Sequence, residues 1–230
     1  MTQSVSFEKM EAVLYDMDGL IVDTEPIHFQ AFREYMQRHG VDMPESMMSN
    51  FIGFPERDNL RDLKQKYGLD VTLDEMVAER RAVYLHLVGT LPLTVFPGFW
   101  EFTAEAKQRG MKQAVVSSAP AEQVELVLGR LFEGRRDLGR AAEYFDAIVT
   151  GNDIEHNKPA PDIYLVGSER LGVPPALCLA LEDSPPGAQS AAAAGMLVVA
   201  IPNEYTEGLA FPGAASVLPS LEVARRYLDW

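Results

Sequence analysis

The stretch that decides the fold reads Asp16-Met17-Asp18-Gly19-Leu20-Ile21-Val22-Asp23-Thr24-Glu25, and it follows the apolar run Ala12-Val13-Leu14-Tyr15. The run indicates a buried strand that ends at acidic residues and a glycine. Asp16 and Asp18 stand two residues apart where the strand stops, so they leave the same edge of a sheet. In open α/β sheets ligands bind at the carboxyl ends of the strands. Two close carboxylates repel each other unless a cation lies between them or one takes a proton. Simple capping of a turn would explain one Asp and the Gly, but not the whole stretch.

The composition is that of an ordinary globular protein with an acidic balance. The chain has 230 residues, 47% of them hydrophobic and 23% charged, enough for one domain or two small ones. Lys and Arg number 20 against 34 Asp and Glu, which gives a net charge of −14. This balance argues against nucleic-acid or anionic-membrane partners, which favour a basic surface. An anionic substrate must therefore be held by a few locally placed cations.

Two further features bear on the compartment. Cys178 is the single cysteine, which excludes an internal disulfide and a Cys-based zinc site, and its apolar surroundings place it in the core. The start of the sequence carries no basic-then-apolar signal, and the longest apolar stretch, Ala191 to Ile201, is too short to cross a bilayer. We expect a cytoplasmic protein. No pattern fixes the oligomeric state, and a monomer is the simplest expectation.

Strand-like and helix-like segments alternate along most of the chain. The apolar runs after the first are Ala114-Val115-Val116, Ala147-Ile148-Val149, Leu177 to Leu181 and Leu197 to Ile201. The helix-period segments between them are Phe99 to Arg109, Ala121 to Leu131, Pro161 to Leu171 and Gly187 to Ala194. This alternation predicts an α/β fold with a doubly wound parallel sheet covered on both faces. The apolar runs are continuous, as in strands buried on both sides.

The alternation stops between about Thr24 and Phe96, where the chain reads as helices only. These are Ile27 to His39, Glu45 to Phe51, Arg57 to Tyr67 and Leu73 to Leu87. We expect residues 24–95 to form an inserted helical domain, and residues 1–23 and 96–230 to form the α/β core domain. The Arg-rich stretch at residues 132–140 is expected to be a solvated loop.

Three later pieces carry further chemistry, and two of them, Ser117-Ser118 and Glu182-Asp183-Ser184, stand at the ends of other predicted strands. Ser117-Ser118 offers hydroxyl and backbone N–H groups that suit a phosphate oxygen, although a serine there often only caps a helix. Lys158 stands before two prolines, Pro159 and Pro161, which can hold a normally solvated ammonium as a fixed cation. Glu182-Asp183-Ser184 brings a further acidic cluster to the same edge.

Mg²⁺ prefers oxygen ligands and is usually held by one or two carboxylates, waters and a substrate phosphate. Asp16, Asp183 and the main-chain carbonyl of Asp18 can supply such a set, with Glu182 beside them. We therefore expect Mg²⁺ as the cofactor.

The four pieces in this order resemble the four motifs of the haloacid dehalogenase (HAD) superfamily, over a Rossmann-like core from residue 12 to about residue 201. The helical block resembles the cap domain that these enzymes insert after the first motif. The resemblance implies that Asp16 is a nucleophile that becomes an aspartyl phosphate, and that Ser117, Ser118 and Lys158 bind phosphate. Haloacid dehalogenases typically have Tyr at the position of Asp18 and phosphonatases have Ala, so Asp18 favours phosphoryl chemistry as general acid and base.

The β-phosphoglucomutase-like branch, with its many small-metabolite phosphatases, is the most similar subgroup. His28 stands where that branch has a His at the entry to the cap, although an ordinary His on the surface of a helix would give the same pattern. Gly53-Phe54-Pro55-Glu56-Arg57 resembles the loop in which the mutase holds a second phosphate with an Arg, but here Glu56 takes that position and Arg57 follows it. Pro120-Ala121 replaces the Lys-Asn of the mutase pattern.

Both departures favour hydrolysis over mutase activity. We therefore expect a Mg²⁺-dependent phosphatase of a small sugar or polyol phosphate, with a sugar-phosphate mutase as the alternative. A phospho-acceptor switch similar to a response-regulator receiver would leave Asp18 and the helical block unexplained.

Overall fold

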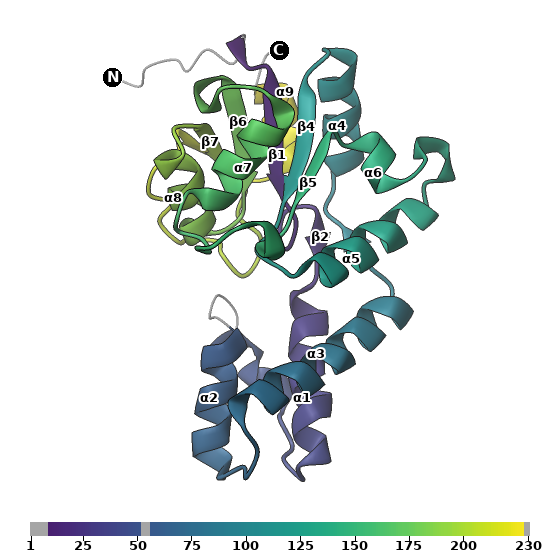
Figure 1. Cartoon of the computed structure of the whole chain (residues 1–230), viewed down its shortest axis with the longest axis vertical. Helices are drawn as coiled ribbons and strands as arrows, with labels where there is room; N and C mark the ends of the chain where they lie inside the picture. The colour runs from purple at the N-terminus through teal and green to yellow at the C-terminus, as the bar shows by residue number, and fades with distance from the viewer. Residues whose placement is uncertain (1–8, 52–55, 228–230) are drawn as a thin grey trace. The chain divides into compact units, whose positions relative to one another are not determined.

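The computed structural model describes residues 9–51 and 56–227 (Figure 1). The chain divides into two compact units, one of Met1–Asp23 with Thr94–Trp230 and the other of Thr24–Leu93. The second unit is thus inserted into the first. The first unit resumes two residues before the expected position, because β3 (Thr94–Val95) pairs antiparallel with β2 (Val22–Asp23).

A six-stranded parallel sheet forms the centre of the first unit, as the alternation of segments predicted. Its order is β5-β4-β1-β6-β7-β8, and each neighbouring pair is parallel. The strands are β1 (Ala12–Asp16), β4 (Lys112–Val116), β5 (Ala147–Val149), β6 (Cys178–Glu182), β7 (Leu197–Ala200) and β8 (Ser216–Val217). The chain moves outward in one direction from β1 to β5 and in the other from β6 to β8. Ligands of doubly wound folds bind at such a reversal, which here lies between β1 and β6.

Helices cover both faces of this sheet. They are α4 (Phe99–Gln108), α5 (Ala121–Glu133), α6 (Ala141–Tyr144), α7 (Asp162–Leu171), α8 (Pro185–Ala193) and α9 (Leu221–Tyr227), with 3-10 turns η3 (Arg136–Leu138), η4 (Gly151–Asp153) and η5 (Pro175–Leu177). In Figure 1, α7 and α8 lie in front of the sheet and α9 lies behind it. The stretch at residues 132–140, expected to be a loop, is partly helical, because its first two residues end α5 and η3 follows.

Successive residues of β1 face opposite sides of the sheet, and every one is buried. Leu14 packs in the cluster that includes Ile163 of α7. The next residue, Tyr15, makes edge-on ring contacts with Phe99 and Phe102 of α4, with ring centroids 5.8 and 6.0 Å apart. Burial on both faces explains why the sequence shows continuous apolar runs instead of alternating ones.

The second unit is helical and has a hydrophobic core of its own. It contains α1 (Glu25–Arg38), η2 (Glu45–Asn50), α2 (Glu56–Tyr67) and α3 (Leu73–Thr90). Its core includes Phe29, Phe32, Tyr35, Met36, Leu60, Leu63 and Met76. The segment from Glu45 is a 3-10 helix. Among the described residues, no helix combines the length and apolarity needed to cross a bilayer.

Candidate active site

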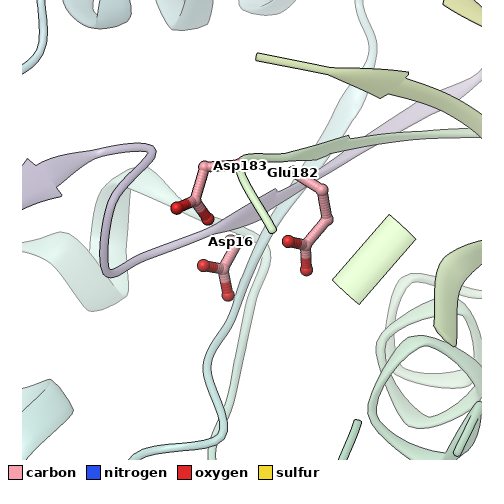
Figure 2. Close-up of side chains that lie close together, drawn as sticks. All are labelled: Asp16, Glu182 and Asp183. Atoms are coloured by element: carbon pink, nitrogen blue, oxygen red, sulfur yellow. The ribbon is translucent and has the colours of Figure 1, made fainter. Parts of the chain in front are cut away.

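Three carboxylates meet at the carboxyl ends of β1 and β6. Tyr15 and Leu181 are paired across the two strands, so Asp16 and Glu182, the next residues, end adjacent strands. Asp183 follows directly. Each of the three acidic side chains offers an oxygen within 4.8 Å of the others, and all three residues are buried. Figure 2 shows their carboxylates gathered at this edge of the sheet.

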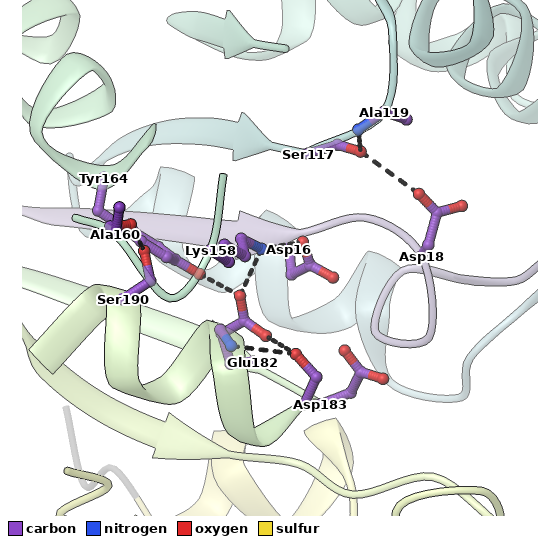
Figure 3. Close-up of polar contacts among 12 residues, drawn as sticks. Asp16, Asp18, Ser117, Ala119, Lys158, Ala160, Tyr164, Glu182, Asp183 and Ser190 are labelled. Carbon is purple, nitrogen blue, oxygen red and sulfur yellow. Dashed lines mark hydrogen bonds and ion pairs between the residues drawn. The ribbon is translucent and has the colours of Figure 1, made fainter. Parts of the chain in front are cut away.

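The Lys158 side chain supplies a positive charge in this cluster. Its Nζ donates to Asp16 Oδ1 and to Glu182 Oε1, both at 2.5 Å (Figure 3). Burial alone would lower the pKa of Lys158, but the Asp16 and Glu182 carboxylates raise it above its ordinary value. The ammonium therefore stays charged, and the Asp16 and Glu182 carboxylates hold it in place.

The Glu182 side chain is occupied on both oxygens. Its Oε1 also accepts from the Tyr164 hydroxyl at 2.6 Å, and its Oε2 accepts from Ser184 Oγ at 3.1 Å. A Cβ added to Gly187 would come within 2.0 to 2.1 Å of the same carboxylate, so any larger residue would have to displace the Glu182 carboxylate. With its oxygens engaged in this way, Glu182 is better placed to hold Lys158 than to bind a metal.

Burial and mutual repulsion dominate the electrostatics of the other two acids. Burial raises the pKa of Asp16 to about 7, although Lys158 opposes the rise, and Glu182 adds to it. Burial, followed by the charges of Asp16 and Glu182, raises the pKa of Asp183 well above its usual range. Three buried carboxylates with one ammonium leave an excess of negative charge.

A divalent cation would relieve this excess. Asp183 Oδ1 is buried and accepts no hydrogen bond, whereas its Oδ2 accepts from the Asn203 side chain at 2.9 Å. An oxygen in this state suits an oxygen-coordinated metal ion, because burying an unpartnered charged group is otherwise costly. The acidic cluster can therefore bind a metal.

The second aspartate of the first motif contacts the serine that follows β4. Ser117 Oγ donates to Asp18 Oδ2 at 3.3 Å and accepts from the Ala119 N–H at 3.1 Å. Figure 3 shows Asp18 and Ser117 linked in this way. The neighbouring Ser118 is exposed. Ser117 is thus placed beside an acid, whereas the hydroxyl of Ser118 faces solvent.

The two residues of the second unit that the sequence singled out lie in different surroundings. His28 stacks on Tyr84 with ring centroids 4.0 Å apart, and its Nδ1 lies 2.7 Å from Arg80 Nη2. Burial, and then the Arg80 charge, lowers the pKa of His28 well below its usual value. Arg57 is exposed and pairs with Asp74 at 2.6 Å. The cation beside His28 is therefore Arg80.

Sequence reasoning missed Arg80, which is only 3% exposed. Its Nη1 donates to Glu56 Oε1 at 2.8 Å, and its Nη2 donates to the His28 carbonyl at 2.8 Å. The sequence did contain a sign of its burial. Arg80 stands four residues after Met76 and four before Tyr84, so it lies on the apolar face of α3. Glu56, which takes the place of the mutase Arg, is thus paired with Arg80. The rest of that motif, residues 53–55, lies outside the described residues.

Comparison with known proteins identifies the family. Residues 13–201 match the family model described as haloacid dehalogenase-like hydrolase. The chain belongs to this family. The matched range of this HAD-like hydrolase contains the acidic cluster, Lys158 and the inserted helical unit.

Individual relatives cover more than four fifths of the HAD-like chain. It is 32% identical to a phosphorylated carbohydrates phosphatase of Thermotoga maritima, over 90% of this chain and 93% of the relative. It is 32% identical to fructose-1-phosphate phosphatase YqaB of Escherichia coli, over 83% and 95%. Among solved structures, CbbY of Rhodobacter sphaeroides in complex with phosphate superimposes with a TM-score of 0.81 at 28% identity, over 96% of this chain and all (100%) of the other.

Proposed function

We propose that this HAD-like protein is a Mg²⁺-dependent phosphomonoester hydrolase that acts on a small sugar or polyol phosphate through an aspartyl-phosphate intermediate. The observation that carries the proposal is the Asp16 carboxylate, which is buried at the strand end, hydrogen-bonded to Lys158 and part of an acidic cluster that can hold a metal. The phosphatase activity and the carbohydrate substrates named for its relatives support the substrate class.

In the first half-reaction, an Asp16 oxygen forms a bond to phosphorus while the bond from phosphorus to the ester oxygen breaks. Asp18 gives its proton to the leaving oxygen. In the second half-reaction, Asp18 takes a proton from water, which attacks the phosphorus and releases Asp16 and inorganic phosphate. Lys158 and the Ser117 hydroxyl would stabilise the negative charge on the transferring group, which is the main catalytic demand of phosphoryl transfer.

The side chains of Asp16 and Asp183 and the main-chain carbonyl of Asp18 would hold Mg²⁺, which supplies positive charge to the phosphoryl oxygens when bound. The unpartnered Asp183 Oδ1 supports this assignment. Glu182, a further candidate ligand, is instead assigned to hold Lys158, because its oxygens accept from Lys158, Tyr164 and Ser184.

Residues 24–93 would serve as the cap that selects the substrate. Hydrolysis is favoured over mutase activity, because a mutase must hold a second phosphate while the phosphoenzyme waits. Glu56 is acidic at the position that carries the mutase Arg, and its pairing with Arg80 engages the cation beside His28. Arg57 is paired with Asp74.

A phosphatase screen tests the proposal. The purified chain is assayed for phosphate release from sugar, polyol, nucleotide and glycolytic phosphates, with Mg²⁺ and after metal removal with EDTA. We expect turnover of a small sugar or polyol phosphate that EDTA abolishes and Mg²⁺ restores. Asp16→Asn should remain folded and inactive. Full activity after confirmed metal removal, or an Asp16→Asn variant with about a tenth of normal kcat, would contradict the mechanism.

A coupled assay distinguishes the alternative. β-Glucose 1-phosphate is supplied with the bisphosphate activator and glucose-6-phosphate dehydrogenase. We expect no sustained NADPH production. Activator-dependent NADPH would show that the protein is a mutase.

A further inference from the structure

Asn203, a residue that no sequence motif singled out, lies in the loop after β7 and contacts the acidic cluster. Its Nδ2 donates to Asp183 Oδ2 at 2.9 Å and to the Gly19 carbonyl at 3.1 Å. One amide nitrogen thereby joins two segments of the first unit that are 164 positions apart in the numbering, from Gly19 to Asp183. The first segment carries Asp18 and the second carries a proposed metal ligand.

The orientation of the Asn203 amide is fixed by its other partners. Its Oδ1 accepts from the Tyr205 N–H at 2.9 Å and from the Thr206 hydroxyl at 3.4 Å. The Asn203 N–H in turn donates to Thr206 Oγ1 at 3.1 Å. The Tyr205 N–H can only donate and the Gly19 carbonyl can only accept, so a flipped amide would lose both of these contacts.

Asp183 and Asn203 fill the space next to Gly19. Gly19 has a φ of +86°, and a Cβ there would lie 2.1 Å from Asp183 Oδ2 and 2.8 Å from Asn203 Nδ2. The loop of the first motif is thus in direct contact with Asp183 and Asn203. With Oδ2 of Asp183 engaged by Asn203, Oδ1 is the carboxylate oxygen without a partner.

We propose that Asn203 is a positioning residue that sets the distance between the first-motif loop and Asp183, and so fixes two of the ligand groups of the metal site. The inference rests on the proposed function, since it concerns the same Mg²⁺ site. Partners that orient metal ligands commonly change metal affinity by about 10- to 100-fold when they are removed. Asn203 has the contacts expected of such a partner, because one amide N–H donates to the proposed ligand Asp183 and the other donates to the carbonyl of Gly19, the residue after Asp18.

Substitution of Asn203 by serine tests this role. Serine can still accept the N–H two residues further on and so support the turn, but it is too short to reach Asp183. A cavity of about 640 Å³ adjoins Gly19 and Asn203, so water can enter when the amide is removed. The matched control is Thr206→Val, which weakens the same turn and leaves both Asn203 donors in place.

Mg²⁺ binding is measured by titration calorimetry of the whole chain without substrate, and kcat is measured as a function of Mg²⁺ concentration. We expect Asn203→Ser to raise the Mg²⁺ dissociation constant about tenfold or more, with kcat largely recovered at saturating Mg²⁺. Thr206→Val should lower the melting temperature and leave the Mg²⁺ dissociation constant close to that of the wild type.

If the wild type binds Mg²⁺, two results would overturn this inference and leave the proposed function standing. One is a Mg²⁺ dissociation constant of Asn203→Ser that equals the wild-type value. The other is a loss of Mg²⁺ affinity in Thr206→Val as large as the loss in Asn203→Ser. The second would mean that only the turn matters. A wild-type protein that binds no Mg²⁺ and keeps full activity in EDTA would overturn the proposed function and this inference with it. The two failures are therefore distinguishable.

Discussion

Replacing Lys158 by methionine should destabilise the first unit in a pH-dependent way. The ammonium is buried and donates to Asp16 and Glu182 at 2.5 Å each. Its removal leaves the two carboxylates and the nearby Asp183 without a compensating cation. Removal of one partner from a buried ion pair typically costs about 3–5 kcal/mol, because the remaining charge stays buried. Methionine keeps most of the side-chain volume, so the loss should be electrostatic.

The pH dependence follows from the raised pKa of Asp16, which is about 7 in the folded protein against 3.8 ordinarily. A carboxyl group whose folded pKa is raised contributes stability that is fully present below its unfolded pKa and is lost as the pH rises through its folded pKa. Lys158 opposes the rise, so its removal raises the pKa of Asp16 further. The deficit of the variant should therefore be larger at pH 8 than at pH 5, by up to about 1.4 kcal/mol, because the two Asp16 pKa values separate only above about pH 7 and one proton contributes about 1.36 kcal/mol per pH unit.

Urea unfolding at both pH values, with and without Mg²⁺, measures the effect. Tryptophan fluorescence can follow the first unit, because Trp100 lies in α4. Lys112→Met is the matched control, since Lys112 is exposed at the amino end of β4. Added Mg²⁺ should restore part of the stability lost in Lys158→Met. An equal deficit at pH 5 and pH 8, or a deficit no larger than that of the control, would refute the reasoning.

Three further predictions concern neighbouring residues. Asp18→Asn should slow phosphoenzyme formation far less with p-nitrophenyl phosphate than with an alkyl phosphate, because a good leaving group needs little protonation; equal losses in single-turnover experiments would exclude the general-acid role. Gly187→Ala must displace the Glu182 carboxylate and should lower kcat about tenfold or more, whereas Gly129→Ala on open space in α5 should keep activity and stabilise the protein by about 0.5–1 kcal/mol. Tyr164→Phe should cost about 1.5–3 kcal/mol in urea unfolding, because it removes a hydrogen bond to a buried carboxylate, and an unchanged stability would contradict that contact.

The sheet was predictable because its strands are buried on both faces. Burial of this kind requires unbroken apolar runs, and such runs are visible without a structure. The short strands were less visible. β2, β3 and β8 have two residues each, which is too short for any period, and only pairing with a neighbour defines them. The segment at residues 45–50 has helix-like composition, yet it forms a 3-10 helix.

Asp16, Ser117 and Asp183 could be proposed because they stand at or just beyond the ends of parallel strands, which meet at one edge of the sheet, whereas Lys158 was proposed from the prolines beside it. The sequence thus identified Asp16, Ser117, Lys158 and Asp183 as candidate site residues. The sequence did not show what surrounds the Glu182 side chain. From its residue type alone, Glu182 could bind a metal as well as hold a lysine. The hydroxyl of Tyr164 and the space at Gly187 are what engage its carboxylate.

The sequence by itself therefore determined the parallel sheet, the inserted helical unit and the set of acidic and cationic groups at one edge. Those features depend on local periodicity and on residue type. Only the tertiary structure decided that Arg80 lies beside His28, that Arg57 lies on the surface, and that Asn203 contacts Asp183. Such pairings depend on the direction of side chains from separate segments. That direction is set by packing between segments far apart in the chain, which no local pattern encodes.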